Sequence, residues 1–347
     1  VITGVPSVEY GDMLSGVVKI NTRKGRTPWQ VTMTTSPSTK QVSLSKGFGL
    51  GTSKNGKSRG VINASAEYAK SLSSKMSPYS SYDRKQVSLS YSTQFTNGVF
   101  SDKPLRFTAG VTGNLGGFDN QSDPDRLLES YYIGKDNAVR GNVSLNWLLS
   151  KKWITNVELN ASVSYGDKKE RQNERYHNAT AVTSIHATKE GYYIAAPWIE
   201  GGSNEAVLIP AGTYYTVMAW DDRPLNTRVA LKANWARNFG KVNNKVKVGA
   251  DWTADKNFGI GEYAEEPEKA PSWREYRYCD VPMMSGLAFY AEENFLLRTG
   301  NDSHLNVIAG IRNDNTIIPG SLYGTTSSLS PRFNAKYTFF TPASLSI

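Results

Sequence analysis

The sequence predicts an all-β chain, an antiparallel transmembrane β-barrel, from three observations: segments that alternate apolar and polar residues, the lack of a long apolar run, and short turns that alternate with long loops. Of the 347 residues, 39% are hydrophobic and 11% aromatic, and the mean hydropathy is -0.46. No window approaches the ~18 consecutive apolar residues of a spanning helix, so a membrane role requires strands that pair with one another. The aromatic content also argues against a disordered chain.

The clearest alternating segment begins at Trp153. From there to Tyr165, odd positions are mostly apolar and even positions mostly polar, a period of two that is typical of a strand. The segment before it, 139–149, alternates in the same way, and only residues 150–152 separate the two. This spacing predicts a hairpin with a short turn.

The same pattern recurs and predicts about a dozen strands. The other strands are expected at 30–35, 41–49, 61–69, 87–95, 107–115, 228–239, 245–252, 287–297, 305–311 and 328–340. Long connections are expected at 71–84, 116–138, 167–225, 258–283 and 313–327. Short turns that alternate with long loops are typical of an up-and-down barrel with short periplasmic turns and long extracellular loops, whereas a soluble sandwich has no reason to keep this asymmetry.

The two faces of the predicted strands differ in character. Aromatic residues near strand ends on the apolar face favour the head-group level of a bilayer, although a sandwich core is the alternative. They are Trp147, Trp153, Tyr165, Trp235, Phe239, Trp252 and Tyr337. The polar face carries Glu158, Lys232, Asp251 and Arg312. A watery or plugged lumen accepts such charges.

Glycines punctuate the first 25 residues around a short β run. Pro6-Ser7, Tyr10-Gly11, Gly16-Val17-Val18 and Ile20-Asn21-Thr22-Arg23 follow in that order, with Thr22 directly after Asn21. This order resembles the C-terminal end of the plug domain of TonB-dependent outer-membrane receptors, with Tyr10, Gly11, Gly16, Asn21 and Thr22 as the plug motif. A second stretch, Gly310-Ile311-Arg312-Asn313-Asp314 followed by Leu329-Ser330-Pro331-Arg332-Phe333, is similar to a mid-barrel stretch of these receptors.

The resemblance implies two domains: residues 1–25 as the C-terminal end of the plug, and residues 26–347 as the first part of a barrel that has twenty-two strands when complete. Half a barrel would leave two unpaired edges in lipid, so we expect the mature protein to continue at both ends. The implied location is the bacterial outer membrane. The implied function is uptake of a scarce nutrient by an energy-coupled rearrangement of the plug.

The resemblance also implies partners. They are the TonB complex of the inner membrane, outer-membrane lipids, a small-molecule or oligomeric nutrient, and a surface lipoprotein lid. The family handles ferric siderophores, haem, cobalamin, oligosaccharides and peptides, and the sequence does not choose among them. Two other functions stay open: a passive porin or structural outer-membrane protein, and a secreted β-rich adhesin.

The predicted loop 167–225 is where we expect the ligand to bind, because long loops with aromatic residues often carry function. The candidate ligand-binding residues are Tyr192, Tyr193, Trp198, Tyr214, Tyr215, Trp220 and Asp222. Aromatic faces stack on sugar rings or on other apolar surfaces of a ligand, and a carboxylate fixes its polar groups. The alternative is that these rings pack the loop against its neighbours.

We expect no enzyme activity, metal site or cofactor. Ser285-Gly286 lacks a Gly-x-Ser-x-Gly pattern, and Glu292 and Glu293 point to opposite faces of a strand. Cys279 fits no metal-binding spacing with the three histidines. The net charge of +9 is spread along the whole chain, so nucleic acid is not expected as a partner.

Overall fold

A computed structural model gives the fold. It describes residues 7–11, 25–53, 56–72, 79–126, 129–180, 185–187, 192–194, 211–266, 269, 277–300, 303–322, 324–339 and 344–346. Among these residues, no helix is long and apolar enough to cross a lipid bilayer. The described helices are three short 3-10 turns at Gly98–Phe100, Pro124–Arg126 and Tyr278–Asp280.

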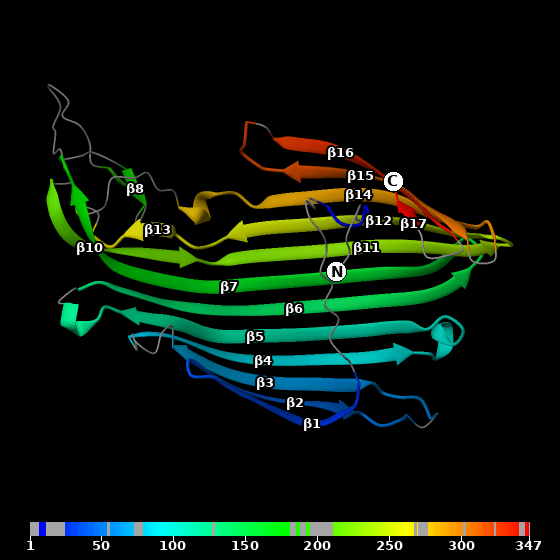
Figure 1. The fold of residues 1–347 in the computed structure, drawn as a ribbon, viewed down its shortest axis with the longest axis horizontal. Helices are drawn as coiled ribbons and strands as arrows, with labels where there is room; N and C mark the ends of the chain where they lie inside the picture. Colours follow the sequence, from blue (N-terminus) through cyan, green and yellow to red (C-terminus); the bar gives the residue numbers. More distant parts are fainter. Residues whose placement is uncertain are drawn as a thin grey trace.

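One antiparallel sheet of 15 strands contains most of the described chain (Figure 1). Its strands are β1 (Thr27–Thr35), β2 (Thr39–Gly49), β3 (Val61–Leu72), β4 (Ser80–Phe95), β5 (Leu105–Gln121), β6 (Tyr131–Lys151), β7 (Ile154–Asn178), β10 (Gly212–Asp222), β11 (Pro224–Phe239), β12 (Val242–Asn257), β13 (Gly261–Ala264), β14 (Met284–Arg298), β15 (His304–Ile317), β16 (Thr325–Thr338) and β17 (Ser344–Ser346). A separate pair is formed by β8 (Ile185–Ala187) and β9 (Tyr192–Ile194). The all-β prediction is confirmed, and each of the dozen predicted strands is present.

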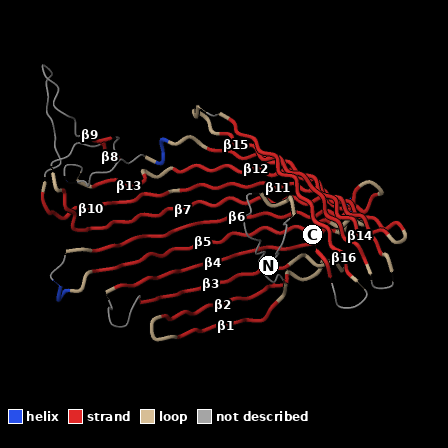
Figure 2. Tube along the Cα trace, turned by 45° about the horizontal axis from the view of Figure 1, so that its top comes forward, coloured by secondary structure: helices blue, strands red, loops and turns tan. Residues whose placement is uncertain are grey.

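The sheet is an up-and-down meander. Its main path follows the chain from β1 to β7 and continues through β11, β12 and β14 to β17, while β10 pairs with the far end of β7 and with β13. The sheet is twisted, so that β14 to β16 run at an angle to β1 to β6 in Figure 2. Within the described residues β1 and β17 stand at the two ends of this path, and the sheet is open. The closed barrel stays a prediction.

The predicted alternation separates two faces across the whole sheet. Val111 lies opposite Gly141, and Gly141 lies opposite Val163, so apolar positions of neighbouring strands stay level with one another. We call this side, which also carries Leu89 and Val248, the outer face. Its side chains are exposed: Val163 is 45% exposed and Leu89 49%. The opposite side, the inner face, carries the polar residues of the same strands.

The two ends of the sheet also differ. At the end with short connections, such as 152–153 and 240–241, aromatic rings of the outer face bond to the turns. Trp147 Nε1 donates to the Lys103 carbonyl at 3.2 Å, and Trp235 Nε1 donates to the Lys152 carbonyl at 2.9 Å. We call this the turn end. The opposite end, which carries the long connections 179–211 and 258–283, is the loop end.

Several strands extend further toward the loop end than the alternation predicts. The predicted loop 167–225 was wrong in its bounds, because β7 continues to Asn178 and β10 pairs with it from Gly212 to Asp222. Likewise, β5 and β6 shorten the predicted connection 116–138 to residues 122–130. The extension of β7 is polar at almost every position, and the extension of β6 places Tyr131, Tyr132 and Ile133 in succession, so neither shows alternation, although pairing still satisfies their backbone groups.

Candidate functional site

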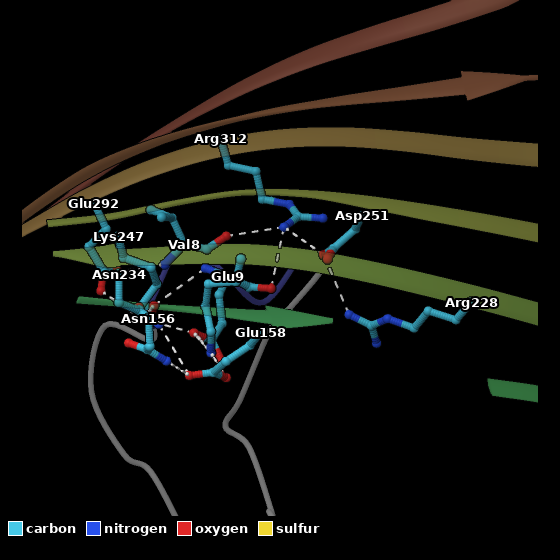
Figure 3. Close-up of polar contacts among 12 residues, drawn as sticks. Val8, Glu9, Asn156, Glu158, Arg228, Asn234, Lys247, Asp251, Glu292 and Arg312 are labelled. Carbon is cyan, nitrogen blue, oxygen red and sulfur yellow. Dashed lines mark hydrogen bonds and ion pairs between the residues drawn. The ribbon is translucent and has the colours of Figure 1, made fainter. Parts of the chain in front are cut away.

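Residues 7–11 lie on the inner face, against strands hundreds of positions further along the chain (Figure 3). The backbone N–H of Val8 donates to Glu292 Oε2 at 2.8 Å. Arg312 Nη1 donates to the carbonyl oxygens of Val8 and Glu9, at 3.2 and 3.3 Å. A segment outside the sheet ladder needs other partners for its backbone groups, and side chains of the inner face supply them here.

Glu9 is the charged residue of this segment, and it lies between two lysines. Its Oε2 is 2.8 Å from Lys247 Nζ and 3.4 Å from Lys232 Nζ. Each lysine also contacts a carboxylate of the sheet: Lys232 lies 3.1 Å from Glu158, and Lys247 lies 3.2 Å from Glu292. The five side chains therefore form one network in which every lysine has two acidic partners.

The environment of Glu9 changes its titration. Burial by itself would raise its pKa, but the hydrogen bond and charge of Lys247, together with the charge of Lys232, outweigh this effect. The pKa of Glu9 is therefore lowered from its ordinary value of 4.5. At neutral pH the carboxylate is therefore ionised and pairs with both lysines.

Arg312 holds the segment from the other side. Its Nη1 lies 3.2 Å from Asp251 Oδ2, and both side chains are 6% exposed. Its Nε donates to Asp314 Oδ1 at 2.8 Å, and Arg228 approaches Asp251 at 3.4 Å. The predicted polar face is thus confirmed, because Asp251 and Arg312 form one of its ion pairs.

The close approach of the segment depends on a glycine. A Cβ atom added to Gly310 would lie 2.6 Å from Val8 Cγ1, so a larger residue would displace Val8, which is 1% exposed. Arg332 Nη1 donates to the Ser7 carbonyl at 2.9 Å. Residues of the stretch 310–314 and Arg332 therefore contact the segment directly, which gives the pattern noticed in the sequence a structural reason.

The plug motif assigned by the resemblance is only partly described. Tyr10 and Gly11 lie in the docked segment, whereas Gly16, Asn21 and Thr22 lie outside the described residues. The strongest contacts come instead from Val8 and Glu9, which the motif does not include. The sequence does contain an indication of Glu9. Lysines and carboxylates recur at every second position, or at multiples of it, on the polar face of β11, β12 and β14, where a charged partner is expected.

The candidate ligand-binding residues fall into three groups. Trp198 lies outside the described residues, and Tyr192 and Tyr193 lie in β9, where only the backbone is described. Tyr214, Tyr215, Trp220 and Asp222 belong to β10 rather than to a loop. Tyr214, Trp220 and Asp222 share the face of β10 that continues the inner face, while Tyr215 points to the other side. Their role in binding stays a prediction.

A cluster of three rings occupies the inner face at the loop end, and we call it the ring platform. Phe118 of β5 and Tyr132 of β6 have ring centroids 4.6 Å apart, and Tyr132 and Trp220 of β10 make an edge contact at 6.4 Å. Tyr132 donates a hydrogen bond to Glu170 of β7. Burial, with this bond and the charge of Glu170, raises the pKa of Tyr132 to about 12. Sequence reasoning missed Phe118 and Tyr132 because they stand on separate strands.

The described residues hold no group of three or more His, Cys, Asp and Glu side chains that could bind a metal ion. Glu292 is buried on the inner face, whereas Glu293 is exposed on the outer face, as their spacing predicts. The site is thus an ion-paired docking surface on one side of a sheet, together with an aromatic cluster at its loop end.

Fold and site define a class: an antiparallel β meander with an apolar outer face, a polar inner face and a peptide segment docked on the latter. No protein-family model matches the chain, and a search of curated proteins gives no match. Among solved structures, a mutant of the ferric enterobactin receptor of Pseudomonas aeruginosa is similar at a TM-score of 0.43 and 13% identity, over 92% of this chain and 42% of that one. The chain therefore spans less than half of that receptor. This level of similarity assigns no family.

Proposed function

We propose that the chain is part of an outer-membrane β-barrel transporter of the TonB-dependent type, in which the segment Ser7–Gly11 belongs to a plug that moves to let a solute pass. One observation carries the proposal: this segment is docked by charges on the inner face of a sheet whose outer face is apolar. A soluble adhesin gives no reason for an apolar, exposed outer face, and a passive porin gives none for the docked segment.

The membrane part of the proposal rests on the length of the apolar band. On β7 the outer face is apolar from Val157 to Tyr165, and charged residues follow from Asp167 onward. This span matches the roughly 9–11 residues that a tilted strand needs to cross the hydrocarbon core. At the turn end, Trp147 and Trp235 direct their N–H groups toward the turns, as rings at a membrane interface do.

The transport part rests on the kind of contact that holds the segment. Val8 is its one fully buried apolar side chain among the described residues, and the other contacts described between the segment and the sheet are ion pairs and hydrogen bonds. Water can replace such bonds when the segment leaves, so displacement costs less than the opening of an apolar core. Energy supplied by the TonB complex, which the resemblance implies, would drive this displacement.

A reversible tether tests the proposal in the full-length protein. In a Cys279→Ser background, the pair Val8→Cys and Gly310→Cys places two thiols where the segment touches β15, because a Cβ atom at residue 310 would lie 2.6 Å from Val8 Cγ1. The test is growth on a panel of ferric siderophores, haem, cobalamin, oligosaccharides and peptides as the limiting nutrient. We expect growth on at least one nutrient to require TonB, to stop when the tether is oxidised and to return on reduction.

Each rival predicts a different result. A passive porin would support growth without TonB and would conduct ions in a planar bilayer whether or not the tether is closed. A secreted adhesin would stay soluble without detergent and would support growth on none of the panel. The single variant Val8→Cys and the reduced double variant serve as controls, because neither holds the tether closed.

A further inference from the structure

A small hollow opens beside the ring platform at the loop end of β5, β6 and β7. Its volume is about 210 Å³. Pockets for drug-sized ligands enclose about 300–1,000 Å³, so this hollow suits a single ring rather than a large chelate. Amide and hydroxyl side chains dominate its lining, among them Asn120, Ser130, Gln172 and Asn173.

These side chains have hydrogen-bonding capacity left over. Gln172 Nε2 donates to Glu174 Oε2 at 2.7 Å, and Asn173 Nδ2 donates to the Glu129 carbonyl at 2.9 Å, so both amides keep their oxygen atoms as acceptors. The side chain of Asn120 makes no hydrogen bond within the described part of the chain. Donors and acceptors therefore stand side by side, as the hydroxyl groups of a polyol require.

Two tyrosines, Tyr131 and Tyr132, stand in the lining of the hollow. Tyr132 lines it and also belongs to the ring platform, where its hydroxyl group is held by Glu170. A ring fixed at its edge offers a flat apolar face at low entropic cost, and such a face packs against the C–H groups of a sugar ring. The one carboxylate in the lining, Glu174, is already bonded to Gln172.

The inner face below the hollow is largely uncharged on two strands. On β5 it carries Asn114, Thr112 and Thr108 and no charged residue before Arg106, and on β4 it carries serines from Ser88 to Ser92. Charged residues of the same face stand beside these rows: Arg84 of β4, which pairs with Glu67, and Asp136 and Arg140 of β6. Ser88 and Thr112 hydrogen-bond to each other at 3.0 Å. The Ser and Thr rows of β4 and β5 differ from β11 to β16, where the segment Ser7–Gly11 docks on charged side chains.

We propose that the hollow and the ring platform bind one ring of an uncharged, hydroxyl-rich oligosaccharide. The passage of this solute along β4 and β5 rests on the proposed function. The binding of the solute at the loop end does not depend on that function. Neutral hydroxyl and amide groups match such a ligand, because they supply hydrogen bonds without the fixed charges that would hold an ion in place.

The test uses the purified full-length protein in detergent, with an array of neutral and acidic oligosaccharides and one ferric catecholate chelate as probes. We expect saturable binding of at least one neutral oligosaccharide. Tyr132→Ala should weaken this binding about tenfold, while Tyr132→Phe, which keeps the ring, should change it less than about threefold. Asn120→Ala should also weaken it. Tyr68→Ala, on the outer face, is the control and should leave it unchanged.

Absence of binding by every neutral oligosaccharide would overturn the inference, as would binding that survives both Tyr132→Ala and Asn120→Ala. A measurement of energised uptake distinguishes a failure of this inference from a failure of the proposed function. If a chelate alone is bound and taken up with the help of TonB, the transporter stands and the oligosaccharide site falls. If an oligosaccharide binds but is not taken up, the site stands and the transporter falls.

Discussion

Replacing Glu9 by Gln should loosen the docked segment without unfolding the sheet. Exposed ion pairs contribute about 0.2–1 kcal/mol, and breaking a buried pair costs about 3–5 kcal/mol. Glu9 lies between these limits, because its side chain is 17% exposed and both of its lysines keep a second carboxylate. We therefore expect a loss of about 1–2 kcal/mol, which shifts the docking equilibrium by a factor of about 5–30.

Hydrogen exchange at the backbone amide of Val8 measures this shift, because that N–H is protected only while it is bonded to Glu292. On the full-length protein in detergent micelles, exchange should accelerate by the same factor of about 5–30. Glu293→Gln is the matched control, since Glu293 is exposed on the outer face, next to Glu292. An unchanged rate in Glu9→Gln, or an equal acceleration in the control, would refute the assignment of Glu9 as an anchor of the segment.

Three further outcomes follow from the same geometry. Because the pKa of Glu9 is lowered in the docked state, the stabilisation of docking by Glu9 is complete above pH 4.5 and is lost as the pH falls through the lowered pKa. The hydrogen-exchange rates of the Val8 amide in wild type and in Glu9→Gln should therefore converge in acid. Arg312→Met leaves Asp251, which is 5% exposed, without its closest partner, so the free energy of unfolding measured in urea should fall by about 3–5 kcal/mol. An unchanged urea midpoint would contradict the buried ion pair. Val163→Arg on the outer face should lower the free energy of unfolding in lipid vesicles by about 2–4 kcal/mol, and Ser162→Arg on the inner face should lower it far less. Equal losses of stability would argue against lipid at the outer face.

The strands that cross the apolar band could be predicted because one rule governs them. Between Val157 and Tyr165, each side chain faces either the apolar side or the polar side, and a slip of one residue would exchange the two. The same rule placed Glu158, Lys232, Asp251 and Arg312 on one face, where they form two ion pairs. Alternation was sufficient for these positions.

Beyond the apolar band the rule fails. From Asp167 to Asn178, β7 has polar residues on both faces, so nothing in the pattern separates a strand from a loop. Its pairing with β10 depends on residues far along the chain, such as Trp220 opposite Glu170, 50 positions away. The ring platform was missed for the same reason, because its members come from three strands and meet only when the register is known.

The distribution of charge on the inner face would let the docked segment leave at low cost, as the proposed function requires. If Lys232 and Lys247 had Glu9 as their one partner, its departure would strand two cations on the wall at a cost of several kcal/mol. Each lysine instead has its own carboxylate, Glu158 or Glu292, in the sheet. The wall is therefore compensated before the segment arrives and after it leaves, and Glu9 adds a bond that water can replace. Duplicated partners of this kind would suit the plug of the proposed function, which docks and undocks repeatedly.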